Sequence, residues 1–285
     1  MKKINISEIL RMKKEGRKIT CVTSYDYTSA ALVDRSGIDL ILVGDSASMV
    51  VLGYQTTIPA GMDEMILFSK AVTRGNKRSL IVGDMPFMSY QASDEDAVRN
   101  GGKFIKDGRV DAVKIEGGMK MKNRVEALTR ARIPVMGHVG LMPQTSPLWS
   151  GYRIQGKTDI TAEEIIKDAM SLEEAGAFSV VLEMVTSEVA KMITERLSIP
   201  TIGIGSGPHC DGQIVVFHDI LGLYDKFTPK FIKKYANLAE DIQKALESYR
   251  DEVVNGKFPA DENTFHMKDY TSNTSVKRRI IKNTR

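Results

Sequence analysis

The chain has 285 residues, of which 42% are hydrophobic and 27% charged, as in globular proteins with a packed core. The net charge of +4 lies mainly in residues 268–285, where six lysines or arginines accompany one acid, so residues 1–267 are nearly neutral and offer no basic face for nucleic acid. No apolar run approaches the roughly 20 residues that cross a bilayer, and the N-terminus is unlike a signal peptide. The two cysteines, Cys21 and Cys210, make no disulfide framework. We therefore expect a cytoplasmic protein.

Short β-branched runs alternate with amphipathic helical stretches along the chain. Strands are expected at about 19–23, 39–44, 79–83, 111–115, 134–138, 178–182, 200–204 and 214–217. Helices are expected at 28–36, 62–75, 94–107, 119–131, 162–175 and 187–197. Ser93 and Thr161 are the expected N-caps of two of them. Because each parallel connection needs a crossover helix, eight strands predict an α/β fold, a closed (βα)8 TIM barrel. A doubly wound open sheet is the alternative, although it would normally have fewer strands.

No repeat or low-complexity linker divides the chain, so one domain is expected. Residues 1–267 are predicted to form a single catalytic barrel, in which 225–267 are terminal helices, and 268–285 a flexible basic tail. Three connections that follow strands are unusually long, namely 46–60, 139–160 and 205–213. In a barrel they lie on one face, where long loops are more often functional than idle.

Acids and one histidine follow six successive expected strands. They are Asp26, Asp45, Asp84, Glu116, His138 and Glu183. Any one of them could reflect only solvent exposure at a strand end, but together they converge on one mouth, where barrel enzymes place catalytic groups. Carboxylates brought together raise each other's pKa unless a cation lies among them. The cluster, above all Asp45, Asp84 and Glu116, therefore predicts a divalent metal ion, and ligands limited to oxygen favour Mg²⁺ over zinc.

Strand alternation adds detail to the fourth strand. Lys114 and Glu116 are two residues apart and point the same way, while the apolar Val113 and Ile115 suit the side that faces the helices. Lys114 and Glu116 are thus predicted to point into the barrel. Lys114 could be a structural partner of Glu116, or could grip a substrate carboxylate beside the metal. A Schiff-base lysine is a third option, but a nearby acid would keep Lys114 protonated.

Other candidates carry less information. His138 could orient a substrate oxygen or the metal's water, or could simply be a buried residue of the core. His209, Cys210 and His218 have no metal-ligand spacing. The glycine-rich run 203–207 follows the seventh strand, where barrels often bind phosphate, but it lacks a dinucleotide or P-loop spacing, which favours backbone crowding.

Several motifs together resemble the ketopantoate hydroxymethyltransferase (3-methyl-2-oxobutanoate hydroxymethyltransferase) family over about residues 3–266. They are Val43-Gly44-Asp45-Ser46, Gly83-Asp84-Met85-Pro86-Phe87-Met88-Ser89-Tyr90, Val113-Lys114-Ile115-Glu116-Gly117-Gly118, Gly137-His138-Val139-Gly140-Leu141, Gly151-Tyr152-Arg153-Ile154-Gln155-Gly156, Ile199-Pro200-Thr201-Ile202-Gly203-Ile204-Gly205, Cys210-Asp211-Gly212-Gln213 and His218-Asp219. The chain departs from the family pattern at Ala47-Ser48 (commonly Leu-Gly), at Gln55-Thr56 (Asp-Ser) and at Asn263 (His).

The resemblance implies a barrel of the phosphoenolpyruvate/pyruvate-domain type that assembles as a decamer and acts in pantothenate and coenzyme A biosynthesis. Such enzymes transfer a hydroxymethyl group from 5,10-methylenetetrahydrofolate to 3-methyl-2-oxobutanoate through a Mg²⁺-stabilised enolate, giving 2-dehydropantoate. By position, Asp45 and Asp84 would ligate Mg²⁺ and contact the substrate, and Glu116 would lie at or near the metal through water. Ser46 and Lys114 would hold the substrate carboxylate, and Glu183 would be the base that removes the C3 proton. His138 and Tyr25 are candidates for supporting roles.

Two alternatives stay open. One is another metal-dependent, enolate-forming barrel enzyme, such as a 2-oxo acid carbon–carbon lyase or a phosphoenolpyruvate mutase-like enzyme. The other is a non-catalytic barrel, against which the intact set of acids and Lys114 argues. The sequence does not place the residues that bind folate.

Overall fold

The computed structural model describes residues 2–145, 153–226 and 229–267. Eight parallel strands close into a barrel in chain order, which confirms the predicted fold. They are β1 (Ile19–Thr23), β2 (Leu40–Val43), β3 (Leu80–Asp84), β4 (Ala112–Lys114), β5 (Val135–Gly140), β6 (Ser179–Glu183), β7 (Thr201–Ile204) and β8 (Gly212–Val215). Each strand overlaps its expected range.

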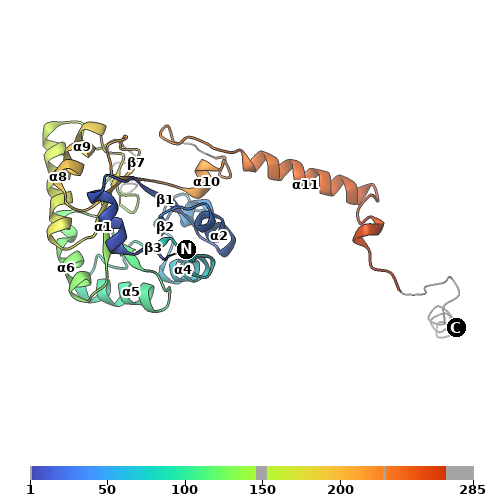
Figure 1. Ribbon diagram of the computed structural model, residues 1–285, viewed down its shortest axis with the longest axis horizontal. Coiled ribbons are helices and arrows are strands. Elements are labelled where there is room, and N and C mark those ends of the chain that lie inside the picture. Colours follow the sequence, from blue (N-terminus) through green and yellow to red (C-terminus); the bar gives the residue numbers. More distant parts are fainter. Residues whose placement is uncertain (1, 146–152, 227–228, 268–285) are drawn as a thin grey trace. The chain divides into compact units, whose positions relative to one another are not determined.

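Helices cover the outside of the barrel (Figure 1). They are α2 (Tyr27–Arg35), α4 (Met62–Gly75), α5 (Asp94–Lys106), α6 (Lys122–Arg130), α8 (Asp159–Glu174) and α9 (Ser187–Arg196). The shorter elements are α3 (Ala47–Val50), α10 (Phe217–Ile220), and the 3-10 turns η1 (Met119–Met121) and η2 (Asp261–Asn263). The predicted range 119–131 is thus one 3-10 turn followed by α6.

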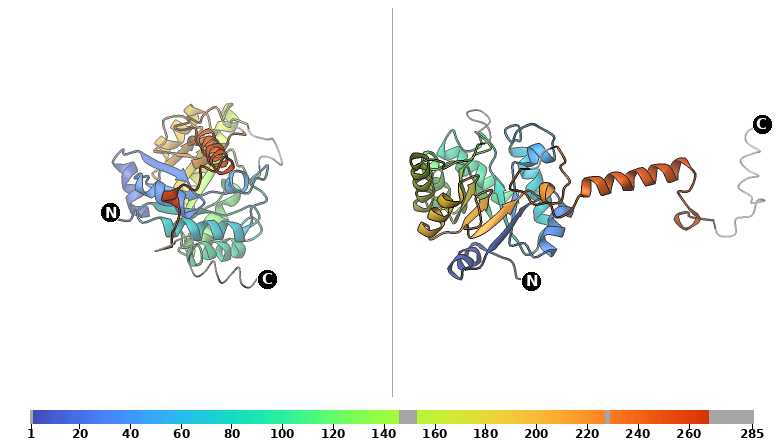
Figure 2. Two further views of the ribbon diagram at one scale, coloured as in Figure 1. Left: turned by 90° about the vertical axis from the view of Figure 1, so that its right-hand side faces the viewer. Right: turned by 90° about the horizontal axis from the view of Figure 1, so that it is seen from above.

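An additional N-terminal helix, α1 (Ile6–Lys14), was not predicted. Its buried Ile9 and Met12 belong to the same apolar cluster as Ile19 and Leu80, which are the first residues of β1 and β3. Helix α1 therefore closes the end of the barrel at which the strands begin (Figure 2). The opposite end, where the strands finish, stays open.

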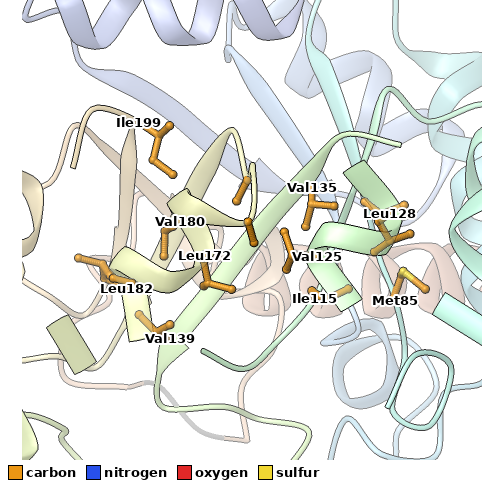
Figure 3. Close-up of a cluster of buried hydrophobic side chains, with 14 of the residues drawn as sticks. Met85, Ile115, Val125, Leu128, Val135, Val139, Leu172, Val180, Leu182 and Ile199 are labelled. Atoms are coloured by element: carbon orange, nitrogen blue, oxygen red, sulfur yellow. The ribbon is translucent and has the colours of Figure 1, made fainter. Parts of the chain in front are cut away.

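Two apolar clusters hold the barrel together, one inside it and one between the sheet and the helices. Figure 3 shows part of the outer cluster, where Leu128 of α6 and Leu172 of α8 lie near Val135 and Val180 of the sheet. Full burial of each such side chain stabilises the fold by about 1.5–3 kcal/mol. Val113 and Ile115 belong to this outer cluster and their neighbour Ala112 to the inner one, as strand alternation predicts.

The two predicted N-caps have different outcomes. Ser93 is confirmed, because its Oγ accepts a hydrogen bond of 3.0 Å from the backbone N–H of Asp96. Thr161 is wrong, because α8 begins three residues earlier than expected, with Thr158 as its N-cap. Thr161 is instead the other half of a capping box, since its Oγ1 accepts a hydrogen bond of 3.1 Å from the backbone N–H of Thr158.

The chain divides into two compact units, Met1–Ala236 and a second that begins at Asn237. The second contains α11 (Leu238–Val254), on which no residue is buried. Apolar spacing in 225–267 predicts terminal helices, and α11 is one of them. The single domain expected for residues 1–267 stays a prediction. The predicted tail, 268–285, lies outside the described residues. No helix in the described part of the chain is both long enough and apolar enough to cross a membrane.

Candidate active site

A pocket of about 670 Å³ opens at the ends of the strands. It brings together the predicted residues Asp45, Ser46, Asp84, Lys114, Glu116, His138 and Glu183. Asp26, the acid after the first strand, does not line it. Its carboxylate caps α2 by accepting hydrogen bonds of 2.8 and 2.9 Å from the backbone N–H groups of Thr28 and Ser29. The strand-end pattern thus located the pocket, and one of its acids has a structural role.

Lys114 is a buried cation in the pocket. Its Nζ donates a hydrogen bond of 2.7 Å to Oδ1 of Asp84 and lies 3.6 Å from Oε1 of Glu116. Burial alone would lower the pKa of Lys114, but the charges of Asp84, Glu116 and Asp45 raise it instead. The amine is therefore protonated, which argues against a Schiff-base nucleophile. Asp84, rather than the expected Glu116, is its nearer partner.

Asp45 and Asp84 are buried, line the pocket, and affect each other electrostatically. The backbone N–H of Asp45 donates a hydrogen bond of 3.2 Å to Oδ2 of Asp84. Burial and the charge of Asp84 raise the pKa of Asp45 well above its usual value, and burial raises the pKa of Asp84 in spite of Lys114. The single charge of Lys114 therefore does not compensate these carboxylates fully.

The donor set fits a hard divalent cation. Oε1 of Glu116 is buried and accepts no hydrogen bond from the described residues. The raised pKa values of the two aspartates indicate that their ionised forms lack a compensating cation. Among the described residues, no three His, Cys, Asp or Glu side chains are arranged as a complete metal site. This is compatible with Mg²⁺, which is usually held by one or two carboxylates and keeps several waters. Asp45 and Asp84 are the pair that could hold it.

His138 lies between two acids from neighbouring parts of the barrel. Its Nδ1 is 3.4 Å from Oε1 of Glu116 and its Nε2 is 3.4 Å from Oε2 of Glu183, although neither contact has the geometry of a hydrogen bond. Burial and Lys114 act to lower the pKa of His138, but the two carboxylates outweigh them and raise it to about 9. The imidazole is therefore a cation beside Glu183 rather than a neutral core residue.

A chain of hydroxyl groups leads to Ser46. The backbone N–H of Phe217 donates to Oγ1 of Thr23 at 3.1 Å, and this hydroxyl donates to the Tyr25 oxygen at 2.8 Å. The Tyr25 oxygen lies 2.8 Å from Oγ of Ser46. Either hydroxyl can be the donor in this contact. When Tyr25 donates, the hydroxyl proton of Ser46 is left to donate to a ligand in the pocket.

Sequence reasoning missed Gln144 and Tyr90. The Gln144 side chain donates to Oδ2 of Asp45 at 3.1 Å, and its backbone N–H donates to Oε2 of Glu116, also at 3.1 Å. The Tyr90 hydroxyl donates to Oε1 of Gln144 at 2.9 Å. The two residues therefore hold the acids in place. The unusual length of the 139–160 connection was the available signal for Gln144.

The weaker candidates have structural roles. Cys210 is buried, and burial raises the pKa of its thiol. The glycine-rich run after β7 is crowded, as expected: at Gly205, where φ is +65°, an added Cβ would lie 2.8 Å from the ring of Phe231. Gly205 thus allows Phe231 to pack against the barrel mouth.

The family model of ketopantoate hydroxymethyltransferase matches residues 3–261. The chain belongs to this family. A 3-methyl-2-oxobutanoate hydroxymethyltransferase of Nitrosopumilus maritimus is 55% identical over 263 residues, which are 92% of this chain and 94% of that protein. One of Moorella thermoacetica is 54% identical over 92% of this chain and 98% of that protein. The predictions of the family and of a hydroxymethyl-transferring enzyme are confirmed.

Solved structures of other enzymes share the fold. A 2,3-dimethylmalate lyase, described as a phosphoenolpyruvate mutase/isocitrate lyase superfamily member, has a TM-score of 0.58 at 15% identity and covers 98% of this chain and 97% of its own. A phosphoenolpyruvate phosphomutase of Streptomyces platensis subsp. rosaceus has a TM-score of 0.60 at 12% identity. The match covers 93% of this chain and 92% of that protein's chain. These enzymes share the predicted (βα)8 barrel, and at this identity the likeness concerns the fold alone.

Proposed function

We propose that this enzyme forms the enolate of 3-methyl-2-oxobutanoate in the pocket, with Glu183 as the base, and joins it to the one-carbon unit of 5,10-methylenetetrahydrofolate. The observation that supports this mechanism is the placement of a charged Lys114 and paired aspartates in the same pocket as Glu183. A 2-oxo acid needs its carboxylate and keto oxygen held while a proton leaves C3. The product would be 2-dehydropantoate, which serves pantothenate synthesis.

Substrate binding and metal binding would fall to residues of different charge. Lys114 and the hydroxyl of Ser46 would bind the substrate carboxylate, as a cation and a directed hydrogen-bond donor. Asp45 and Asp84 would hold Mg²⁺, with Glu116 supporting it through water. When bound, this ion supplies Lewis-acid stabilisation of negative charge on the keto oxygen. Gln144 keeps the Asp45 carboxylate in position through its 3.1 Å hydrogen bond.

The location of Glu183 suits it to act as the base. Its side chain is 15% exposed, whereas those of Asp84 and Glu116 are 2% exposed, so a substrate can reach it. The charge of His138, whose Nε2 lies 3.4 Å from Oε2 of Glu183, would help to orient this carboxylate. Water would hydrolyse the donor, so that tetrahydrofolate leaves and the one-carbon unit is released at the oxidation level of formaldehyde. Glu183 would take the proton from C3, and the resulting carbon nucleophile would attack the released carbon. The oxygen that came from water would then take up the proton held by Glu183 and become the hydroxyl group.

Isotope exchange combined with product analysis tests this proposal. With Mg²⁺ in D₂O, we expect deuterium to enter C3 of 3-methyl-2-oxobutanoate, and 2-dehydropantoate to form when methylenetetrahydrofolate is added. Absence of exchange would rule out the substrate or the base. Exchange without product on addition of the donor, together with cleavage of a larger 2-oxo acid, would favour the lyase alternative.

A further inference from the structure

We propose that the side of the pocket formed after β7 and β8 binds the reduced folate, with Asp219 accepting hydrogen bonds from its pterin ring. This proposal rests on the proposed function, because it concerns the second substrate of that reaction. It assigns a place to the donor, for which the sequence motifs give none.

The barrel order determines the side from which the donor approaches. The carboxylates and Lys114 lie at the ends of β2, β3 and β4, and in a closed barrel with the strand order β1 to β8 the ends of β7 and β8 lie across from them. A 2-oxo acid held by its oxygens on the β2–β4 side turns C3 towards the opposite side. Glu183, at the end of β6, already lies towards that side. The one-carbon unit must therefore arrive from the β7–β8 side.

The composition of that side differs from that of the acidic cluster. Its lining includes the apolar or aromatic residues Ile204, Val215, Val216, Tyr224 and Phe231. Apart from the catalytic cluster, Asp219 and Lys230 are the charged residues among the described lining. A small 2-oxo acid fills only part of a pocket of about 670 Å³. The remaining space suits a largely aromatic ligand with few polar groups.

Asp219 is an acceptor without a donor in the described structure. It is half-buried after β8, and no described residue donates a hydrogen bond to its carboxylate. A reduced pterin carries an N–H and an amino group side by side on its pyrimidine ring. Two parallel donors of this kind match the two oxygens of one carboxylate, as a guanidinium does. An apolar surface without such a carboxylate would bind any flat ring. Asp219 would therefore make the β7–β8 side of the pocket selective for a pterin.

The outer part of the pocket fits the rest of the donor. Phe231, 39% exposed, lies against Gly205 and offers a ring face for the aminobenzoyl group. Lys230 is exposed and lines the rim, where it can meet the carboxylates of the glutamate tail. The lining thus includes a half-buried carboxylate, a partly exposed aromatic ring and an exposed cation. Folate carries a group that matches each of them.

Two reactions of the same protein separate donor binding from catalysis: the complete transfer reaction, and deuterium exchange in the absence of folate. In Asp219→Asn, which keeps the shape of the side chain, we expect the KM for methylenetetrahydrofolate to rise about ten- to hundredfold, as for the loss of hydrogen bonds to a charged group. Deuterium exchange at C3, measured without folate, should stay at the parental rate. Asp225→Asn, an exposed acid in the same connection, is the matched control and should change neither quantity.

A donor analogue without the 2-amino group gives a second, independent readout. The parent enzyme should discriminate against this analogue, and Asp219→Asn should treat the two donors nearly alike. A parental KM for the donor in Asp219→Asn would overturn the proposal, and so would retained discrimination. A joint loss of exchange and transfer would assign Asp219 to the 2-oxo acid instead. If the parent protein itself showed no exchange, the proposed function would fail rather than the folate site.

Discussion

Nζ of Lys114 lies 2.7 Å from Oδ1 of Asp84, and the two side chains are only 4% and 2% exposed. Removing one member of such a buried pair leaves the other charge without compensation, which typically costs about 3–5 kcal/mol. We therefore expect Lys114→Met to lower the free energy of unfolding by that order, measured by urea denaturation. Mg²⁺ should restore part of the loss, because it binds the carboxylates that have lost their partner.

The matched control is Lys167→Met. Nζ of Lys167 lies 3.6 Å from Oε2 of Glu163, and both side chains are more than half exposed. Exposed pairs contribute about 0–1 kcal/mol, so little change is expected. Equal destabilisation by the two substitutions would contradict the role given to the buried pair.

Asp84→Ala should abolish Mg²⁺-dependent turnover and weaken Mg²⁺ binding measured by calorimetry. The reason is the loss of one of the two carboxylates that fit the ion. Asp63→Ala, which removes an exposed acid in the first turn of α4, should leave both measurements unchanged. Full parental activity in excess chelator would refute a metal-dependent mechanism.

Glu183→Gln should slow deuterium exchange at C3 by about 10²- to 10⁴-fold, the usual effect of a positioned base. Binding of the 2-oxo acid should change little, since Lys114 and Ser46 remain. The control is Glu188→Gln, an exposed acid at the start of α9. Exchange at the parental rate in Glu183→Gln would mean that another group removes the proton.

Tyr25→Phe should raise the KM for the 2-oxo acid about two- to tenfold, because the Ser46 hydroxyl loses its hydrogen-bond partner at 2.8 Å. In a Ser46→Ala background the same substitution should have almost no further effect, as expected for two groups that act through one contact. Tyr27→Phe, at an exposed position, is the control. Additive effects of Tyr25→Phe and Ser46→Ala would show that Tyr25 does not act through Ser46.

The periodicity of the sequence predicted the barrel because β-branched runs and amphipathic helices have different repeats. Strand alternation also predicted that Lys114 points inward. Local sequence patterns did not predict which residues distant in sequence contact one another. Asp26 follows a strand as Asp45 does, yet its carboxylate caps α2. Gln144 reaches Asp45 from a loop 99 residues away, a contact that only closure of the barrel creates.

The same limit applies to the C-terminal helices. Apolar residues at helical spacing in 225–267 predicted terminal helices, of which α11 is one, but whether they are buried depends on surfaces that the helix sequence does not contain. Ile242 and Leu246 are 45% and 62% exposed. Spacing alone therefore predicts the helix and not the burial of its side chains.

Donor affinity should depend on pH through Asp219. Burial raises the pKa of this carboxylate to about 6, against a smaller opposing effect of Lys234, while the neighbouring Tyr25 stays neutral because burial raises its pKa. Only the ionised carboxylate accepts two hydrogen bonds from the pterin ring, so protonation competes with binding. The KM for methylenetetrahydrofolate should be constant above about pH 7 and rise up to about tenfold per pH unit below about 6. In Asp219→Asn this rise should disappear while the KM stays high at every pH. A pH-independent donor KM in the parent, or the same rise in the variant, would assign the dependence to another group.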